Sequence, residues 1–179
     1  MDTNYFRTYV FLIFILLTIY CYGAGMMDYF AVYEPWKLID DEGFAAFHQY
    51  QGKRVINIFV IPSAVMTLFN ILSLLLPPAY VKRKWLAWSL IAYSFDWIFS
   101  FTMQIPIQLE LEKRKDMHLL AELLDTNWYR FAADTVQFLI VCALLLKLFN
   151  TLGHRVHVSH EPASRIKFQK SVSKKSQLS

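Results

Sequence analysis

Four polar residues recur at helical spacing around the start of the apolar run "TVQFLIVCALLLKLF": Asn127, Arg130, Asp134 and Gln137. Side chains spaced in this way lie along one face of a helix. An Asp or Arg at the middle of a bilayer costs about 2.5 to 3.5 kcal/mol, so these groups must face one another or water rather than lipid. Arg130 and Asp134 are close enough along one helix to form an ion pair, and such groups inside a membrane commonly take up protons or solutes.

A second polar stripe has a four-residue repeat and consists of Asp96, Ser100, Gln104 and Gln108. Steps of this length drift slowly round a helix, so these side chains form a nearly continuous line. Pro106 frees the carbonyl of Thr102 and is expected to bend the helix near Gln104. Asp96 then requires a partner on another helix, or a bound proton.

His48 belongs to the segment "EGFAAFHQYQGKR", in which Phe44, Phe47, His48 and Gln51 recur at helical spacing. This pattern is typical of a short amphipathic helix that lies in the membrane interface. Such a helix would let His48 face the polar stripes from the membrane surface. The segment that follows has Pro62 as a second expected kink, and its polar residues are Asn57, Ser63, Thr67 and Asn70.

These residues require helices that cross a membrane, and the composition of the chain indicates that such helices are present. The chain has 179 residues, of which 56% are hydrophobic and 17% aromatic, and this is too apolar for a soluble domain of its size. A spanning helix takes about 20 apolar residues, and four segments qualify: about 9–30, 55–76, 85–109 and 128–149. The first is longer than the apolar region of a signal peptide, so we expect a retained anchor. The sequence predicts an all-α fold, an integral membrane four-helix bundle over residues 1–150, with the short interfacial helix before the second span.

The distribution of Lys and Arg predicts the orientation of the bundle. Arg7, Lys82–Lys84 and Lys147 fall on one side with almost no acidic residues, whereas most Asp and Glu residues fall on the other. We therefore expect a multi-pass protein of the cell membrane with both termini in the cytoplasm. Residues 151–179 form a basic, serine-rich cytoplasmic tail that cannot bury a core. We expect this tail to be disordered and to touch anionic lipid.

The sequence lacks the motifs of several kinds of functional site. The sequence has no glycine-rich phosphate loop, no nucleophile elbow, no paired-cysteine motif and no histidine pair inside the spans to hold a haem, so we expect neither a cofactor nor a metal. The tail motif "HRVHVSH" lies in a basic segment without cysteines, and we expect no metal there either. Cys21 and Cys142 lie at different depths and should remain free thiols. The basic pI follows from membrane topology, so nucleic acid is not expected as a partner.

For each polar group, a purely structural role remains an alternative. The pair of Arg130 and Asp134 could simply orient its helix, while Asp96 and the glutamines could hold the bundle together by hydrogen bonds. His48 could be an interfacial histidine with no special role. The convergence of many ionisable and amide groups at one depth favours a functional site, because four helices need fewer of them for packing alone.

Four stretches of the sequence carry a resemblance to a known family: "YEPW" at 33–36, "FAAFHQYQGKRVINIFVIPSAVM" at 44–66, "TMQIPIQLEL" at 102–111 and "TNWYR" at 126–130. In this order they resemble the anthrone oxygenase-like proteins, which are small four-span membrane proteins. That family includes fungal anthrone oxygenases and many bacterial members whose reaction is unassigned. The resemblance implies a cofactor-free oxygenase that inserts oxygen into an electron-rich, lipophilic aromatic compound.

The resemblance also implies a site, made of His48, Gln104, Gln108, Asn127, Trp128 and Arg130. Taken with the polar stripes, it leads us to expect three catalytic residues, His48, Arg130 and Asn127. The expected substrate-binding residues are Trp36, Gln104, Gln108, Trp128, Asp134 and Asp96. In this chemistry a base removes a phenolic or benzylic proton, and amide or Arg donors stabilise the anion, which then reacts with oxygen unaided. Glutamines stand at 104 and 108 where asparagines are usual in the fungal members, and this changes the reach of the amides.

Two other functions remain as alternatives. Asp96, Asp134 and Arg130 could bind and transport protons or a small solute, in which case polar groups should continue toward the cytoplasmic side. The segments "LLLP" at 74–77 and "VCALLL" at 141–146 are instead nearly pure hydrocarbon. The protein could also be an accessory subunit of a membrane protein partner, for which the small residues "GAG" at 23–25 would allow close helix contact.

Overall fold

A computed structural model describes the backbone of residues 3–159 and the side chains of residues 4–150. The chain divides into two units, Met1–Leu144 and Leu145–Ser179. In the second unit, the described residues are the last turns of a helix that ends at Ser159. The boundary of the tail expected at residue 150 therefore falls inside this helix, and the remainder of the expected tail, residues 160–179, lies outside the described residues. All of the following concerns the first unit.

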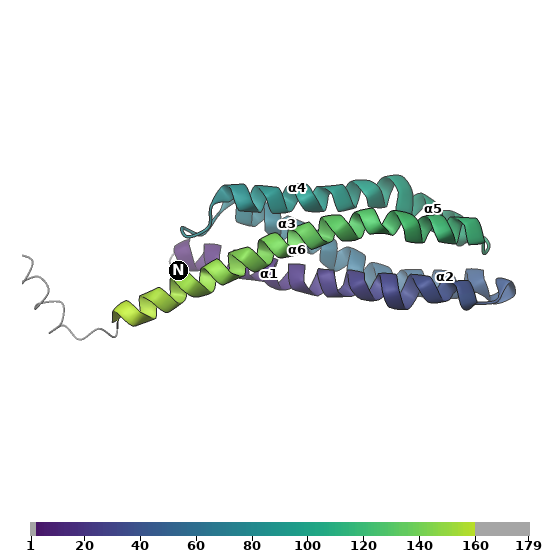
Figure 1. Cartoon of the computed structure of the whole chain (residues 1–179), viewed down its shortest axis with the longest axis horizontal. Helices are drawn as coiled ribbons and strands as arrows, with labels where there is room; N and C mark the ends of the chain where they lie inside the picture. Colours follow the sequence, from purple (N-terminus) through teal and green to yellow (C-terminus); the bar gives the residue numbers. More distant parts are fainter. Residues whose placement is uncertain (1–2, 160–179) are drawn as a thin grey trace, which may run out of the picture. The chain divides into compact units, whose positions relative to one another are not determined.

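The described chain is helical, which confirms the all-α class. In chain order its elements are α1 (Thr3–Met27), the π-helix η1 (Asp28–Tyr33), the 3₁₀-helix η2 (Glu34–Leu38), α2 (Asp41–Val55), the π-helix η3 (Ile56–Val60), α3 (Ile61–Leu75), α4 (Arg83–Phe99), the π-helix η4 (Ser100–Gln104), α5 (Ile105–Leu111) and α6 (Met117–Ser159). Because several of these follow one another without a break, the residues group into helical runs at 3–38, 41–75 and 83–111 and the helix that starts at 117. Within the first unit the runs lie side by side, with α1 along α3 and α3 against α4 (Figure 1).

Each π-helical turn comes directly before a proline in the first turn of the next helix. The pairs are η1 with Pro35, η3 with Pro62, and η4 with Pro106. A proline lacks the N–H of an i→i−4 bond and its ring crowds the preceding carbonyl, and a wider turn relieves that crowding. In η4, the hydroxyl of Thr102 donates to the carbonyl of Ile98 at 2.7 Å, so this carbonyl keeps a partner in the widened turn. The bend expected from Pro106 thus takes the form of a π-helical turn that ends at Gln104.

Three helical segments are long and apolar enough to cross a membrane: Asn4–Leu38, Asp41–Leu75 and Met117–Asn150. The expected span at 85–109 lies in the continuous helical run 83–111, which is not one of these three segments. The expected interfacial helix is α2, and it passes through η3 into α3 without a break. The helix lengths and their apolar composition indicate a membrane protein.

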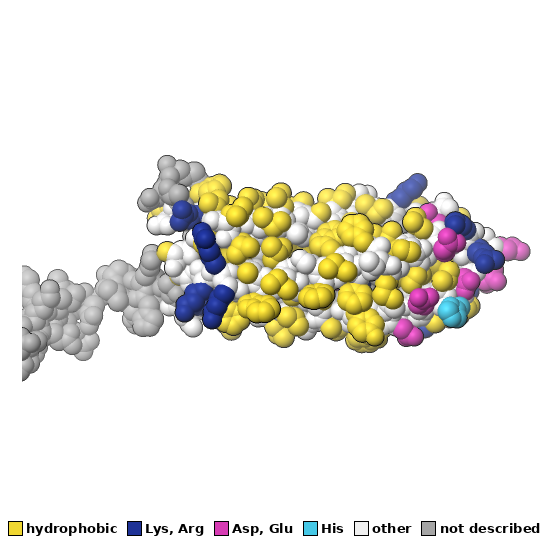
Figure 2. All heavy atoms as spheres, turned by 90° about the horizontal axis from the view of Figure 1, so that it is seen from above, with side chains coloured by type: hydrophobic (Ala, Val, Ile, Leu, Met, Phe, Trp, Pro, Cys, Tyr) yellow, Lys and Arg dark blue, Asp and Glu magenta, His cyan; other side chains and the backbone are white. Residues whose placement is uncertain are grey.

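The surface of the first unit separates apolar and charged side chains. Figure 2 shows a broad band of hydrophobic side chains, with Lys and Arg at one end of the band and a mixed group rich in Asp and Glu at the other. The basic end contains the start of α1, the α3–α4 loop with Lys82, and the first residues of α4, Arg83 and Lys84. The acidic end contains the η2–α2 and α5–α6 loops. An exposed apolar band between two charged ends is the surface expected for a protein surrounded by lipid.

A hydrophobic core and the contacts of Lys115 hold the acidic end together. The core joins η1, η2, α2, α5 and α6 through buried side chains of Tyr33, Trp36, Phe44, Ile107, Leu111, Leu120, Leu123 and Leu124. Lys115, from the α5–α6 loop, donates to the carbonyl of Ile39 at 2.6 Å and lies 3.4 Å from the carboxylate of Asp41. These contacts fix η2 and α2 beside α5 and α6, which sets the position of the residues that follow.

Candidate functional site

A cavity of about 620 Å³ lies between the helical runs 41–75 and 83–111, with η1, η2 and α6 closing its far side. Much of its wall is apolar, from Val55, Ile56, Phe59, Val60, Trp97, Ile105 and Leu109. Polar side chains from seven helical elements also line it, and these include Tyr33, His48, Ser63, Tyr93, Asp96, Ser100, Gln104, Gln108 and Arg130. Ligand pockets typically have about 300 to 1,000 Å³ and combine apolar walls with a few placed polar groups. This cavity has both properties.

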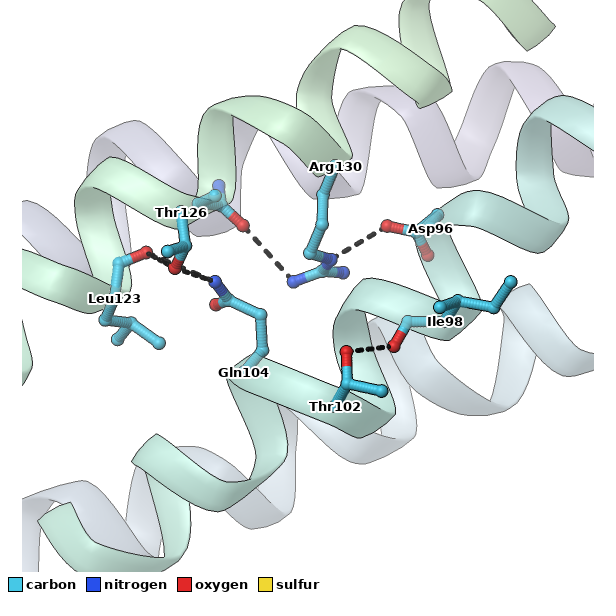
Figure 3. Close-up of polar contacts among 8 residues, drawn as sticks. Asp96, Ile98, Thr102, Gln104, Leu123, Thr126 and Arg130 are labelled. Carbon is cyan, nitrogen blue, oxygen red and sulfur yellow. Dashed lines mark hydrogen bonds and ion pairs between the residues drawn. The ribbon is translucent and has the colours of Figure 1, made fainter.

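Arg130 is the cation of the cavity wall and is held in one orientation. Its Nε donates to Asp96 Oδ1 at 2.8 Å, and its Nη1 donates to Asn127 Oδ1 at 3.2 Å (Figure 3). The ion pair joins α6 to α4 and is nearly enclosed, with side-chain exposures of 10% for Arg130 and 4% for Asp96. Tyr33 also lies beside the guanidinium. A buried guanidinium with two of its nitrogens fixed is a preorganised donor for an oxygen atom in the cavity.

Gln104, at the end of η4, reaches across to α6. Its Nε2 donates to Thr126 Oγ1 at 2.8 Å and to the Leu123 carbonyl at 3.3 Å (Figure 3). Its Oε1 is buried and has no partner within residues 4–150. The hydroxyls of Ser63 and Tyr93, which also line the cavity, are unpartnered in the same way. Buried polar atoms rarely go without a partner, so these three indicate a bound polar group or ordered water.

His48 lies at the α2 end of the cavity inside an aromatic cage. Its ring is 4.5 Å from that of Trp36 and 5.6 Å from that of Phe44, measured between ring centroids. Its Nε2 lies 2.7 Å from Gln108 Oε1, and because that oxygen is an acceptor, Nε2 carries the proton. Nδ1 is then the basic nitrogen, and it is buried without a partner in the described structure. His48 therefore offers the cavity wall a ring nitrogen that has no partner in the described structure.

A second, much smaller cavity of about 10 Å³ also borders Arg130. It is lined by Asp28, Asn127 and Asp134, while Arg130 and Phe59 border both cavities. Asp28 and Asp134 each have one buried carboxyl oxygen without a partner among the described residues. A space of this size holds one water molecule when several polar groups surround it, and this condition is met here.

The structure brings most of the sequence-predicted residues together. Trp36, His48, Asp96, Gln104, Gln108 and Arg130 all line the large cavity. Asn127 and Asp134 lie just behind it, the first bonded to Arg130 and the second in the small cavity. Trp128 is separate from this group, because its side chain is half exposed and packs against Tyr29 and Phe131. Its position suits an aromatic residue at a membrane surface rather than a substrate contact.

The partner of Arg130 differs from the one that spacing along α6 suggested. The sequence pointed to Asp134, one turn away on the same helix, but the ion pair is with Asp96 on α4. Asp96 thus has the partner on another helix that it was expected to need. A pair that crosses between helices also fixes their relative rotation, which a pair within one helix cannot do.

Sequence reasoning missed several residues at the site. Tyr93 and Phe59 look like ordinary apolar side chains of a span, and Tyr33 was noted only as part of a motif. Asp28 carried a usable signal, since it is a lone acid at the end of the first apolar run, where an ionisable group requires an explanation. Their convergence depends on the rotation of each helix, which the sequence does not display directly.

Within the described residues, no group of three or more His, Cys, Asp or Glu side chains could hold a metal ion. Cys21 and Cys142 are free thiols. No family model, curated protein or solved structure matches this chain.

Proposed function

We propose that this chain is an integral membrane protein whose large cavity binds a lipophilic small molecule through an oxygen-bearing polar end. One observation carries the proposal: an apolar cavity of about 620 Å³ contains a buried, prepositioned guanidinium beside several unpartnered polar atoms. An empty apolar pocket of this size would not need a charged donor in its wall. A molecule with a carbonyl, phenolate or carboxylate group would satisfy that donor and cover the apolar surface.

The lining suggests how such a molecule would lie. Its oxygen would accept a hydrogen bond from the guanidinium of Arg130, close to Tyr93 and Gln104, whose unpartnered atoms could bind a hydroxyl or a bridging water. Its apolar body would lie against Phe59 and Trp97, which supply aromatic surface. This arrangement selects an amphiphile with one polar end.

We further propose oxygenation without a cofactor as the reaction of this site. His48 would accept a proton from a CH₂ group activated by a neighbouring aromatic carbonyl, and Arg130 would stabilise the resulting enolate. The anion gives an electron pair to dioxygen and forms a hydroperoxide, which loses water. One CH₂ group and one O₂ become one C=O group and one H₂O. The support is that His48 and Arg130 border one cavity, with an unpartnered ring nitrogen on the first and a fixed guanidinium on the second.

We also propose the membrane arrangement in full. The run 83–111 would be a fourth span, because it lies beside α3 and carries Asp96 and Gln104 toward the bundle interior. The basic end would face the cytoplasm, so that both termini lie there and the cavity belongs to the outer half. The α2 segment, with charged residues in its first and last turns, would lie at the outer interface.

A second candidate function is the binding or transport of protons. The observation that favours it is the pair of buried carboxyl groups, Asp28 and Asp134, beside a cavity of water size. Together with Asp96 they outnumber the single nearby guanidinium, so burial favours protons on the excess acids. Proton movement across liposomes containing the protein, measured with a pH-sensitive dye, would distinguish this function from ligand binding.

The test of ligand binding uses 9-anthracenecarboxylate, a fluorescent molecule with an apolar body and one carboxylate. Titration into the protein in lipid nanodiscs should give saturable binding. Ser100 lines the cavity and is buried, whereas Ser94, on the same helical run, is exposed and lies outside it. Ser100→Phe should weaken binding about tenfold or more, a change of ~1.4 kcal/mol, and Ser94→Phe should leave it unchanged. Equal binding by both variants would show that the probe binds elsewhere.

The test of the reaction measures oxygen uptake with anthrone as the substrate. His48→Gln keeps a side-chain amide that can donate to Gln108 but has no basic nitrogen. We expect this variant to retain 9-anthracenecarboxylate binding and to lose anthrone-dependent oxygen uptake. Binding without any turnover in the wild-type protein would leave the cavity a binding site and remove the oxygenase proposal.

A further inference from the structure

The large cavity is open on one side of the bundle. Four of its apolar lining side chains are also exposed on the outer surface: Ile56 at 50%, Val60 at 37%, Ile105 at 40% and Leu109 at 54%. Ile56 and Val60 belong to η3, and Ile105 and Leu109 belong to α5. A side chain that both lines a cavity and reaches the surface marks an opening. The opening therefore lies between η3 and α5.

Hydrogen bonds join the helical runs 41–75 and 83–111 on both sides of this opening. On the side of the basic end, Trp97 Nε1 donates to Thr67 Oγ1 at 3.0 Å, and farther along Asn70 bonds to Ser89 at 3.2 Å. At the acidic end, His48 bonds to Gln108 at 2.7 Å, and Gln49 Nε2 donates to the Glu112 carbonyl at 3.1 Å. These bonds give the opening the form of a slot, because it is fixed at both of its ends.

The environment of the slot follows from its surroundings. Val60 lies inside the apolar segment Asp41–Leu75, which is long enough to cross a membrane. Exposed side chains of such a segment contact acyl chains rather than water. Three exposed polar residues of the lining, Gln49, Lys53 and Glu112, lie toward the acidic end. The slot thus faces the hydrocarbon region, and its end nearest the acidic end of the unit faces the polar interface.

We infer that this slot is a lateral portal through which an amphiphile enters the cavity directly from the bilayer. The inference rests on the proposed function for the identity of the site, and it narrows the ligand class to molecules that first partition into lipid. The polar end would pass between Val60 and Ile105 and reach Arg130, while an attached chain could remain in the bilayer. Hydrophilic anions that do not partition into lipid would have no comparable route.

The test uses a fatty acid with a photoreactive diazirine on its chain, incorporated into proteoliposomes of phosphatidylcholine. After irradiation, mass spectrometry of peptides should find the label inside the cavity, at the segment with Tyr93 and Ser100, as well as on the lipid-facing surface. Val60→Trp should obstruct the slot and remove the label from the cavity. Val65→Trp is the matched control, since Val65 has nearly the same exposure, 38%, on the following helix but does not line the cavity.

A second pair of variants distinguishes obstruction of the slot from a loss of folding in Val60→Trp. Leu109→Trp obstructs the slot from the α5 side, and Leu68→Trp is its control at equal exposure outside the cavity. The portal is supported if both slot variants lose cavity labelling while both controls keep it. Cavity labelling that persists in Val60→Trp and Leu109→Trp would overturn it. If cavity labelling persisted in these variants while 9-anthracenecarboxylate bound normally, the portal would be wrong and the proposed binding site would stand. If labelling depended on the slot but 9-anthracenecarboxylate did not bind, only the proposed preference for its headgroup would be wrong.

Discussion

The ion pair between Arg130 and Asp96 offers the sharpest test of how this bundle is held together. The change is Asp96→Asn, which preserves the shape of the side chain and removes its charge. In the native protein the two groups are 2.8 Å apart, with side-chain exposures of 10% and 4%. The substitution removes the carboxylate that is paired directly with a buried guanidinium, whose bond to Asn127 is to a neutral amide.

The size of the effect follows from this burial. Breaking a buried ion pair by removing one partner costs about 3 to 5 kcal/mol. For a chain of this length each kcal/mol lowers the melting temperature by about 2 to 4 °C, so the expected loss is roughly 6 to 20 °C. The double variant Asp96→Asn with Arg130→Gln should recover most of this loss, because no unpaired charge then remains. The stability penalty thus belongs to the orphaned charge rather than to the missing contact.

The assay is thermal unfolding in a mild detergent, followed by the near-ultraviolet circular dichroism of the tryptophans. The protein contains a matched control, the pair of Lys113 and Glu110, which has nearly the same separation, 2.7 Å, but exposures of 68% and 57%. Glu110→Gln should cost only about 0 to 1 kcal/mol. If Asp96→Asn melted within the range of Glu110→Gln, or if the double variant were less stable than the single one, the reasoning from burial would be refuted.

Two further outcomes are expected from the packing at the acidic end. Leu123→Ala, in the buried core, should lower the free energy of unfolding by about 2 to 5 kcal/mol, because it leaves a cavity. Leu139→Ala, at a position 60% exposed on the same helix, should change it little, so equal losses in chemical denaturation would show that the core has been placed wrongly. Trp36→Phe removes the bond from Trp36 Nε1 to Gln51 Oε1 at 2.7 Å and should cost about 1 kcal/mol in the same measurement. The added change Gln51→Leu should recover part of that cost, and no recovery would mean that the bond contributes little.

Much of the site could be found from the sequence because polar residues are rare in apolar helices. Asp96, Gln104, Gln108 and Arg130 stood out by type and spacing, and all of them line the cavity. Their chemistry is visible because each requires an explanation wherever it falls in a membrane. Tyr93 and Phe59 have no such signature, since aromatic residues are common in spans, and only their positions in the structure associate them with the site.

The partner of Arg130 could not be read from spacing, and the reason is geometric. Asp134 lies one turn away along α6, whereas Asp96 comes from another helix with an unrelated sequence position. Each π-helical turn inserts an extra residue and rotates the following face by about 100°. The three such turns, η1, η3 and η4, therefore change which side chains of the first three helical runs point inward. The prolines that accompany them are visible in the sequence, but the resulting rotation is not.

The sequence by itself determined the helical class, the apolar segments, the separation of basic from acidic ends, and the polar residues that must avoid lipid. These properties depend on residue type and on the fixed period of one helix, so they are local. Tertiary structure alone decided that Asp96 neutralises Arg130, that Trp128 faces outward, and that an apolar slot opens between η3 and α5. Those features depend on the relative rotation and separation of helices far apart in the chain, which arise only when the whole bundle packs.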